Sequence, residues 1–428
     1  MLRSLFSAIS GLQAHQTKMD TVGNNIANVN TVGYKSSTTV FEDTLSQVLR
    51  NGSAPTGTAG GTNPAQVGLG VKVAEITTNF SQGSTQSTGR SSDFMINGDG
   101  FFVTKSGNQQ LYTRAGSFDF DGSGRLVTPD GNVLQGWMAT NGAVNTNGPV
   151  GDLSVPFGQS LAPASTKNSQ VAGNISADAV ATDPPVQTQA TMYDSLGQAH
   201  QVSYVFQKTA TANTWSLNVL DDKGNTMLPT TPGPPVTPTL VTVAFDAAGV
   251  MTSPTMGAPA VPGAFQFTPP AATFPSWAGP VTVDLTGMSQ FGGKSTAIAS
   301  APTVGAGSAQ GSLESFSLGN DGTITGVYSN GLRQTIGQLA LANFANPGGL
   351  TKSGNSSYVV GDNSGTPAIG VAGVGGRGSL QAGALEMSNV DLSQEFTGLI
   401  IAQRGFQANS KVITTSDQIL QDLVQMKQ

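Results

Sequence analysis

Five residues between positions 119 and 130 have types and a spacing that could bind a calcium ion. Asp119, Asp121, Ser123, Gly124 and Asp130 match positions 1, 3, 5, 6 and 12 of the calcium-loop template. That template needs flanking helices and a bidentate Glu at its last position, whereas this segment is surrounded by turn residues and ends in Asp. A β-turn rich in Asp and Gly explains the pattern better, so we expect no metal site here.

A glycine motif at residues 373–378 is the second candidate for chemistry. Its sequence, GVGGRG, fits the pattern G-x-G-x-x-G of dinucleotide-binding proteins. The phosphate-binding version follows a strand and opens a helix, because the helix N-terminus holds the pyrophosphate. Here the surrounding sequence is a Gly-rich loop without helical periodicity, so we predict no bound cofactor.

Residues for nucleophilic or acid–base chemistry are scarce. Cysteine is absent, which excludes a thiol nucleophile, a disulfide and a thiolate metal site. His15 is expected on a helix surface and His200 at the start of a strand, and neither has a neighbouring acid or nucleophile for a catalytic pair. The sequence therefore predicts a structural protein, not an enzyme.

The composition narrows the class of protein further. The chain has 428 residues, enough for two or three domains, and only 10% of them are charged. A formal net charge of −6 and a pI near 4.9 disfavour nucleic acid as a partner. Apolar runs are too short for a membrane span, and the N-terminus lacks the apolar block of a cleaved signal peptide. We expect no membrane insertion, and either a cytoplasmic location or export without cleavage.

The two ends of the chain carry helical patterns that could position an interaction surface. Residues 1–28 read as a helix with a heptad-like apolar stripe, formed by Leu5, Ile9, Leu12, Met19 and Ile26. Near its end lie the amides Asn24, Asn25 and Asn28. They fit two roles equally well, as caps and turn formers or as hydrogen-bonding groups between packed chains.

The C-terminal residues 389–428 repeat this pattern. The segment 388–391 is a suitable N-cap, and the stripe that follows keeps heptad register through Leu392, Phe396, Leu399, Phe406, Ile413, Leu420 and Val424. Each stripe needs another helix to cover it, in the same molecule or in a neighbour. We predict that these stripes and the amides form a subunit interface. The alternative is that both are amphipathic helices on one globular core.

Between the helices the pattern is β. Short alternating runs separated by Asp-Gly and Asn-Gly turns fill residues 93–136 and 313–344, which suggests one discontinuous inner domain, 71–148 plus 301–388. Alternation at Val202, Tyr204 and Phe206 and at 215–219 marks an inserted outer β domain, 149–300, with a loop at 229–238. Residues 29–70 are predicted to connect helix and sheet, flexibly so at 51–64. The fold class is mainly β with α-helical termini that form a coiled-coil-like pair.

Short motifs at both ends resemble those of the bacterial flagellar rod and hook proteins. The N-terminal motifs are SAISGL at 7–12, NNIAN at 24–28 and GYK at 33–35, and the C-terminal ones are SNVDL at 388–392, AQR at 402–404, QANS at 407–410 and DQ at 417–418. Inner motifs extend the likeness: VGLGV at 67–71, GFF at 100–102, YTR at 112–114 and GSF at 116–118. The chain length and the inserted domain resemble the hook members of the family.

This resemblance implies a homopolymer, an extracellular tube of the flagellum next to the basal body that serves as a universal joint between motor and filament. It implies the distal rod, the hook cap, the hook–filament junction proteins and the flagellar type III export apparatus as partners. The connector between Asp43 and Val67 is longer than in the best-known hook proteins, so a distal rod subunit remains an alternative. From another class, a secreted β-rich carbohydrate-binding or carbohydrate-hydrolysing protein also fits, because a sequence alone does not exclude two carboxylates about 5–10 Å apart in a cleft.

Overall fold

A computed structural model describes residues 2–55, 60–158, 160–231, 237–256, 261–271, 274–277, 279–300 and 304–426. The chain forms two compact units. Unit 1 comprises Met1–Pro156, Phe316–Gly326 and Gln334–Gln428, so it is discontinuous in sequence. Unit 2 comprises Phe157–Ser315 and Val327–Arg333.

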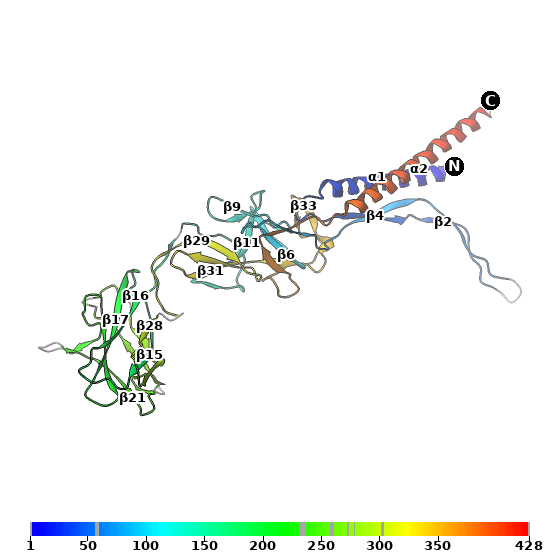
Figure 1. The fold of residues 1–428 in the computed structure, drawn as a ribbon. Coiled ribbons are helices and arrows are strands. Elements are labelled where there is room, and N and C mark those ends of the chain that lie inside the picture. Colours follow the sequence, from blue (N-terminus) through cyan, green and yellow to red (C-terminus); the bar gives the residue numbers. More distant parts are fainter. Residues whose placement is uncertain are drawn as a thin grey trace. The chain divides into compact units, whose positions relative to one another are not determined.

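Unit 1 contains both terminal helices, α1 (Leu2–Ala27) and α2 (Leu392–Gln425), which lie side by side in blue and red in Figure 1. The predicted fold class, mainly β with a helix at each end, is confirmed. Asp391 is the N-cap of α2, because its Oδ1 accepts hydrogen bonds from the backbone N–H of Ser393 at 2.8 Å and of Gln394 at 3.2 Å. The cap thus lies within the predicted segment 388–391, but Asp391, expected as the acid at the third helical position, is itself the N-cap.

The segment after α1 is a long two-stranded hairpin. Strand β1 (Ser37–Asp43) pairs antiparallel with β4 (Val71–Thr78), and β2 (Ser46–Arg50) pairs with β3 (Ala65–Gly68). A bridge between Ser53 and Thr62 continues the pairing. Within the segment 51–64, predicted as a flexible connector, the described residues contain this one bridge, and 56–59 lie outside the described residues. The pairing was missed because it is held by backbone groups, whereas the Gly- and Thr-rich sequence has no apolar alternation there.

The β part of unit 1 is a sheet with the neighbour order β11-β7-β8-β34-β33 and smaller pairs around it. Its strands are β5 (Thr85–Ser87), β6 (Phe94–Asn97), β7 (Phe101–Ser106), β8 (Gln109–Thr113), β9 (Asp119–Phe120), β10 (Leu126–Val127), β11 (Val133–Thr140), β12 (Ala143–Val144), β13 (Gly151–Asp152), β32 (Leu341–Asn343), β33 (Thr351–Gly354), β34 (Ser357–Val359), β35 (Ala368–Gly370), β36 (Ser379–Ala382) and β37 (Ala384–Glu386). Three strands contain residues of both units: β29 (Gly311–Leu318), β30 (Thr323–Tyr328) and β31 (Arg333–Leu339).

An aromatic cluster forms a core of this sheet. Phe101 lies edge-on to Phe344 at a centroid distance of 5.7 Å and to Tyr358 at 5.9 Å, and Tyr112 lies edge-on to Phe344 at 4.9 Å. All four rings are buried. Such edge-to-face pairs add about 0.5–1.5 kcal/mol each beyond the area that they bury. This core fixes the β body on which the helix pair stands.

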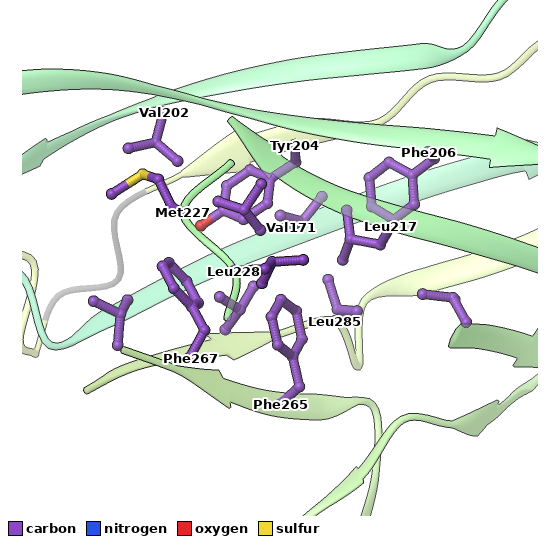
Figure 2. Packing of buried hydrophobic residues seen from close by; sticks show 14 of the residues in the cluster. Val171, Val202, Tyr204, Phe206, Leu217, Met227, Leu228, Phe265, Phe267 and Leu285 are labelled. Atoms are coloured by element: carbon purple, nitrogen blue, oxygen red, sulfur yellow. The ribbon is translucent and has the colours of Figure 1, made fainter. Parts of the chain in front are cut away.

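Unit 2 contains two sheets with a shared core. One has the order β16-β17-β18-β21-β22 and the other β25-β26-β15-β27, with β28 beside β15. Val202, Tyr204 and Phe206 of β17 point toward Phe265 and Phe267 of β25 (Figure 2). The predicted alternation is thus confirmed. The strands are β14 (Ser160–Leu161), β15 (Asn168–Ser176), β16 (Val186–Tyr193), β17 (Ala199–Lys208), β18 (Thr214–Leu220), β21 (Val241–Phe245), β22 (Met251–Ser253), β23 (Thr255–Met256), β24 (Val261–Pro262), β25 (Ala264–Phe267), β26 (Val281–Asp284), β27 (Met288–Phe291) and β28 (Ile298–Ser300).

The segment 229–238, predicted as loop, is paired at its ends. Strand β19 (Thr230–Thr231) pairs with β20 (Thr237–Pro238), and 232–236 lie outside the described residues. Pro238 faces Thr230 in this pair, at the edge of a two-stranded ladder where a missing N–H is tolerated.

Four turns share the sequence pattern D-x-x-G and one geometry. In each, the Asp carboxylate accepts hydrogen bonds of 2.6–3.0 Å from the backbone N–H groups two and four positions later. The Gly at the fourth position has a positive φ of 77–80°, which favours glycine. The turns begin at Asp121, Asp194, Asp221 and Asp246. These carboxylates therefore serve to hold the backbone of the turns in place.

Candidate functional site on the terminal helices

Helices α1 and α2 pack in an antiparallel pair, and the last turns of α2 extend beyond the start of α1 (Figure 1). Asn25 Nδ2 donates to Glu395 Oε1 at 2.9 Å, and a Cβ on Gly398 would lie 3.8 Å from Val22 Cγ2. Further along, Gly405 lies against the ring of His15, and a Cβ on Gly11 would lie 2.8 Å from Asn409 Nδ2. The two residue numbers of each pair add up to the same total, as an antiparallel pair requires.

The seam of this pair is built from small and polar residues. On α2 the seam residues Gly398, Ala402, Gly405 and Asn409 follow a 4-3-4 spacing, and Ala402 is fully buried. A side chain on Gly405 would collide with the imidazole of His15, which is half-buried and not on the helix surface as predicted. Sequence reasoning missed this seam because it searched for large apolar residues. The spacing of the small ones was the available signal.

The large apolar stripes predicted as an interface lie beside the seam. On both helices a stripe residue follows a seam residue by one position, as Leu12 follows Gly11 and Phe406 follows Gly405. One residue is about 100° of helical rotation. Because the helices are antiparallel, the same offset places both stripes on one side of the pair. We call this side the apolar face; it consists of Leu5, Ile9, Leu12, Met19, Ile26, Leu392, Phe396, Leu399, Phe406, Ile413, Leu420 and Val424.

The single chain leaves the apolar face uncovered. Phe396 is 51% and Val424 66% exposed, and Ile9, Leu392 and Leu420 are also exposed. The remaining seven residues of the face are half-buried. The opposite side of α1 is covered by the hairpin, with His15 edge-on to Phe41 at a centroid distance of 5.6 Å. The structure thus brings the predicted stripes together and leaves them open on one side.

The three amides near the end of α1 have separate roles. Asn25 is fully buried and bonds within the chain: its Nδ2 also donates to Ser37 O at 2.8 Å, and its Oδ1 accepts from Tyr34 Oη at 3.1 Å. Its assignment to a subunit interface is therefore corrected. Asn28 Nδ2 donates to Asn24 Oδ1 at 2.7 Å; Asn24 is exposed and Asn28 is half-buried.

A buried ion cluster anchors the helix pair to the β body. Glu386 accepts from Lys35 Nζ at 2.6 Å and from Arg114 Nη1 at 3.4 Å, and all three side chains are at most 2% exposed. Lys35 Nζ also donates to Ser81 O at 2.7 Å, and Gly83 N donates to the carboxylate at 2.9 Å. Segments from both ends of the chain, the one between α1 and β1 and strand β37, therefore meet at one carboxylate.

The cluster holds two cations against one anion away from water. Burial lowers the pKa of Lys35 and of Arg114 below their ordinary values, although Glu386 acts in the opposite direction. The guanidinium also lies 5.5 Å from the ring centre of Phe101. In the sequence, Lys35 and Arg114 stand out only as parts of the motifs GYK and YTR, and no spacing or pattern indicates that they pair with Glu386.

The other chemical candidates have structural explanations. Asp121 Oδ2 accepts from Arg125 Nε at 2.8 Å, and its other oxygen caps the turn, as the β-turn interpretation predicted. Within the described residues no cluster of three metal-ligating side chains occurs. The 373–378 segment joins β35 to β36 without a helix, and Arg377 Nε donates to Val371 O at 2.9 Å. The predicted loop is thus confirmed.

His200 differs from its prediction in one respect. It lies at the start of β17 as expected, but its Nε2 is 3.6 Å from Oδ2 of the buried Asp194. Ser276 Oγ donates to the same carboxylate oxygen. The hydroxyl is thus bonded to the acid and not to the imidazole, which is not the order that a serine nucleophile requires. Although burial alone would raise it, hydrogen bonds from Ser276 and backbone N–H groups hold the pKa of Asp194 below its ordinary value.

The described helices include none long and apolar enough to cross a membrane. Four family models match the chain: "Flagella basal body rod protein" at residues 5–35, "Flagellar hook protein FlgE/F/G D1 domain" at 95–180, "Flagellar basal body protein FlaE D2 domain" at 175–302 and "Flagellar basal body rod FlgEFG protein C-terminal" at 381–426. The two terminal models contain most of α1 and α2.

Relatives match over the full length. The flagellar hook protein FlgE of Borreliella burgdorferi is 40% identical over 100% of both chains, and the flagellar basal-body rod protein FlgG of Bacillus subtilis is 33% identical over 100% of both. A crystal structure of Helicobacter pylori flagellar hook protein FlgE2 aligns with 69% of this chain and 99% of its own, at 14% identity and a TM-score of 0.47. The chain belongs to the flagellar hook protein FlgE family and is a structural subunit of the hook.

Proposed function

We propose that copies of this chain polymerise helically into the hook tube through the apolar face of the helix pair. The observation that carries this proposal is the row of large apolar side chains left exposed along both helices, with Phe396 and Val424 more than half exposed. Burying one such side chain fully contributes roughly 1.5–3 kcal/mol. Five exposed and seven half-buried side chains in one row exceed what a soluble monomer ordinarily exposes.

The proposed interface keeps all twelve predicted stripe positions, together with the exposed amide Asn24 and the half-buried amide Asn28. Asn25 is removed from it. The proposal retains a terminal helical domain, 1–28 plus 389–428, as the part of the chain that builds the tube core. The β part of unit 1 and the whole of unit 2 then lie outside this tube core.

The hairpin supports the same conclusion. Leu45, Val48, Leu49, Val67 and Leu69 on its outer half are all exposed. An isolated two-stranded hairpin with apolar side chains is marginally stable in water. We propose that a neighbouring subunit covers this half and so adds a second contact between copies.

By resemblance to the hook proteins, the tube would act as a universal joint that transmits motor torque to the filament. Its partners would be the distal rod, the hook cap, the hook–filament junction proteins and the flagellar type III export apparatus, and its location extracellular and next to the basal body. We propose a structural and not a catalytic role. The buried carboxylates Glu386, Asp194 and Asp221 all have bonds within the chain that use them structurally.

Electron microscopy of the purified chain under polymerising conditions tests the proposal. We expect curved tubes from the full chain. A variant without residues 2–28 and 390–428 should stay soluble and folded, as circular dichroism of its strands would show, and form no polymer. Polymers from this shortened chain would refute the two-helix mechanism. Straight rods from the full chain would favour the alternative of a distal rod subunit, a class to which the Bacillus subtilis relative belongs by its name.

A further inference from the structure

Helix α2 carries a second apolar stripe on the other side of the seam. Its residues are Ile401, Ala408, Val412, Ile419 and Met426, spaced 7-4-7-7. Ile401 precedes the seam residue Ala402 by one position, and Ala408 precedes Asn409, so the stripe is rotated in the direction opposite to the apolar face. Ile401 is 55%, Val412 42% and Ile419 46% exposed.

A helical polymer needs two different surfaces that fit each other. A single apolar face that packs on a copy of itself gives a closed two-fold dimer, whereas a heterologous contact between unlike surfaces continues without limit. The helix pair offers two unlike surfaces of heptad spacing: the apolar face on one side and the second stripe on the other. Resting on the proposed function, we infer that the second stripe of one subunit docks onto the apolar face of the next copy of this chain.

The charges beside the two surfaces are complementary. Arg404 and Lys411 lie three positions after Ile401 and Ala408, at the edge of the second stripe. Asp20 lies at the edge of the apolar face, and Asp417 occupies a heptad position within it. All four side chains are exposed, and within the described part of the chain none of them forms a salt bridge. Basic groups thus flank the second stripe from Ile401 to Lys411, whereas the exposed Asp422, three positions after Ile419, makes its far end acidic. The apolar face has acidic groups beside it, so the basic part of the second stripe is the part that favours contact between unlike surfaces.

Two charge-reversed variants of the full chain test this docking. In the first, Arg404→Glu and Lys411→Glu make both surfaces acidic; in the second, Asp20→Lys and Asp417→Lys make both basic. Each variant alone should repel its own copies and need at least a tenfold higher concentration to polymerise. An equimolar mixture should assemble near the wild-type concentration, because the acidic stripe of one then meets the basic face of the other.

The controls separate this inference from the proposed function. Lys105→Glu with Lys223→Glu makes the same change in net charge as the first variant, at an exposed strand position and an exposed turn position, and should assemble normally. Melting of the β units shows that each variant is folded. Docking of unlike surfaces is overturned if either charge variant assembles normally alone, or if the mixture assembles no better than its components. If the mixture fails while Phe406→Ala still raises the critical concentration, the apolar face remains an interface and only the second stripe loses its role.

Discussion

Phe406 is the residue at which the proposed interface can be tested most directly. It follows the seam residue Gly405 and lies half-buried in the middle of the apolar face. Truncating a fully packed Phe to Ala costs about 3–5 kcal/mol. Because the single chain already shields part of the ring, about half of that cost, roughly 2 kcal/mol, is expected to fall on assembly.

This cost converts into a change in critical concentration. Since about 1.4 kcal/mol corresponds to a factor of ten, Phe406→Ala should raise the critical concentration roughly thirtyfold. Light scattering against protein concentration measures this value. The adjacent Gln407→Ala is the matched control, because Gln407 is exposed and belongs to neither stripe. The melting temperature of the β units should be the same in both variants.

One result would refute the reasoning. If Phe406→Ala lowers the melting temperature of the monomer but assembles at the wild-type concentration, the side chain serves the subunit's own helix pair. The C-terminal stripe would then be part of an intramolecular core, which is the alternative that the periodicity left open.

Three further predictions concern the parts that hold the helix pair in place. Glu386→Gln leaves Lys35 and Arg114 buried without their anion and should destabilise unit 1 by about 3–5 kcal/mol in urea titration, while the exposed Glu314→Gln does not; equal midpoints would contradict the buried cluster. Gly405→Leu should reduce the helix content, because the new side chain would push His15 aside. Gly23→Ala should stabilise α1 by about 0.4–1 kcal/mol, because a Cβ at this position meets nothing within 4 Å. Circular dichroism compares the two variants, and a loss of helix in both would count against the small-residue seam. Burial, with Asp391 nearby, raises the pKa of Glu395, although Asn25 and Lys18 oppose this change, so the folded chain binds the proton of this carboxyl more tightly than the unfolded chain does. The stability of the fold should therefore be greatest at a pH below the ordinary pKa of a Glu carboxyl and should fall as the pH rises through the raised pKa. Glu395→Gln should remove this dependence in melting curves recorded across that range.

The sequence was sufficient for the elements that apolar periodicity determines. Both helices, the alternation at 202–206 and the strands near the Asp-Gly turns were predicted because each depends on neighbours within a few residues. The hairpin at 37–78 was missed because its strands expose apolar side chains on both halves and are paired by backbone groups. The Lys35–Glu386 pair was missed because a charge gives no indication of a partner far along the chain.

At the site, the large residues of the apolar face were predictable and the seam beside it was not. A pattern search weights Leu12 and Phe406 and passes over Gly11 and Gly405, although the small residues decide where the two helices touch. Asn25 shows a related limit. An amide in a helix is equally compatible with a contact inside the chain and with one outside it, and only burial separates the two.

The bond between Lys35 and Glu386 has a consequence for the order in which the chain folds. It joins residues 351 positions apart, so it forms only after nearly the whole chain is available. Contacts of such separation form late, whereas β16 and β17, joined by a short turn, can pair as soon as they are present. A chain that stops before Glu386 keeps α1 without its partner helix and Lys35 without its anion. Truncated products of this kind therefore lack half of the apolar face, so the proposed interface between copies requires a chain that has been made through α2.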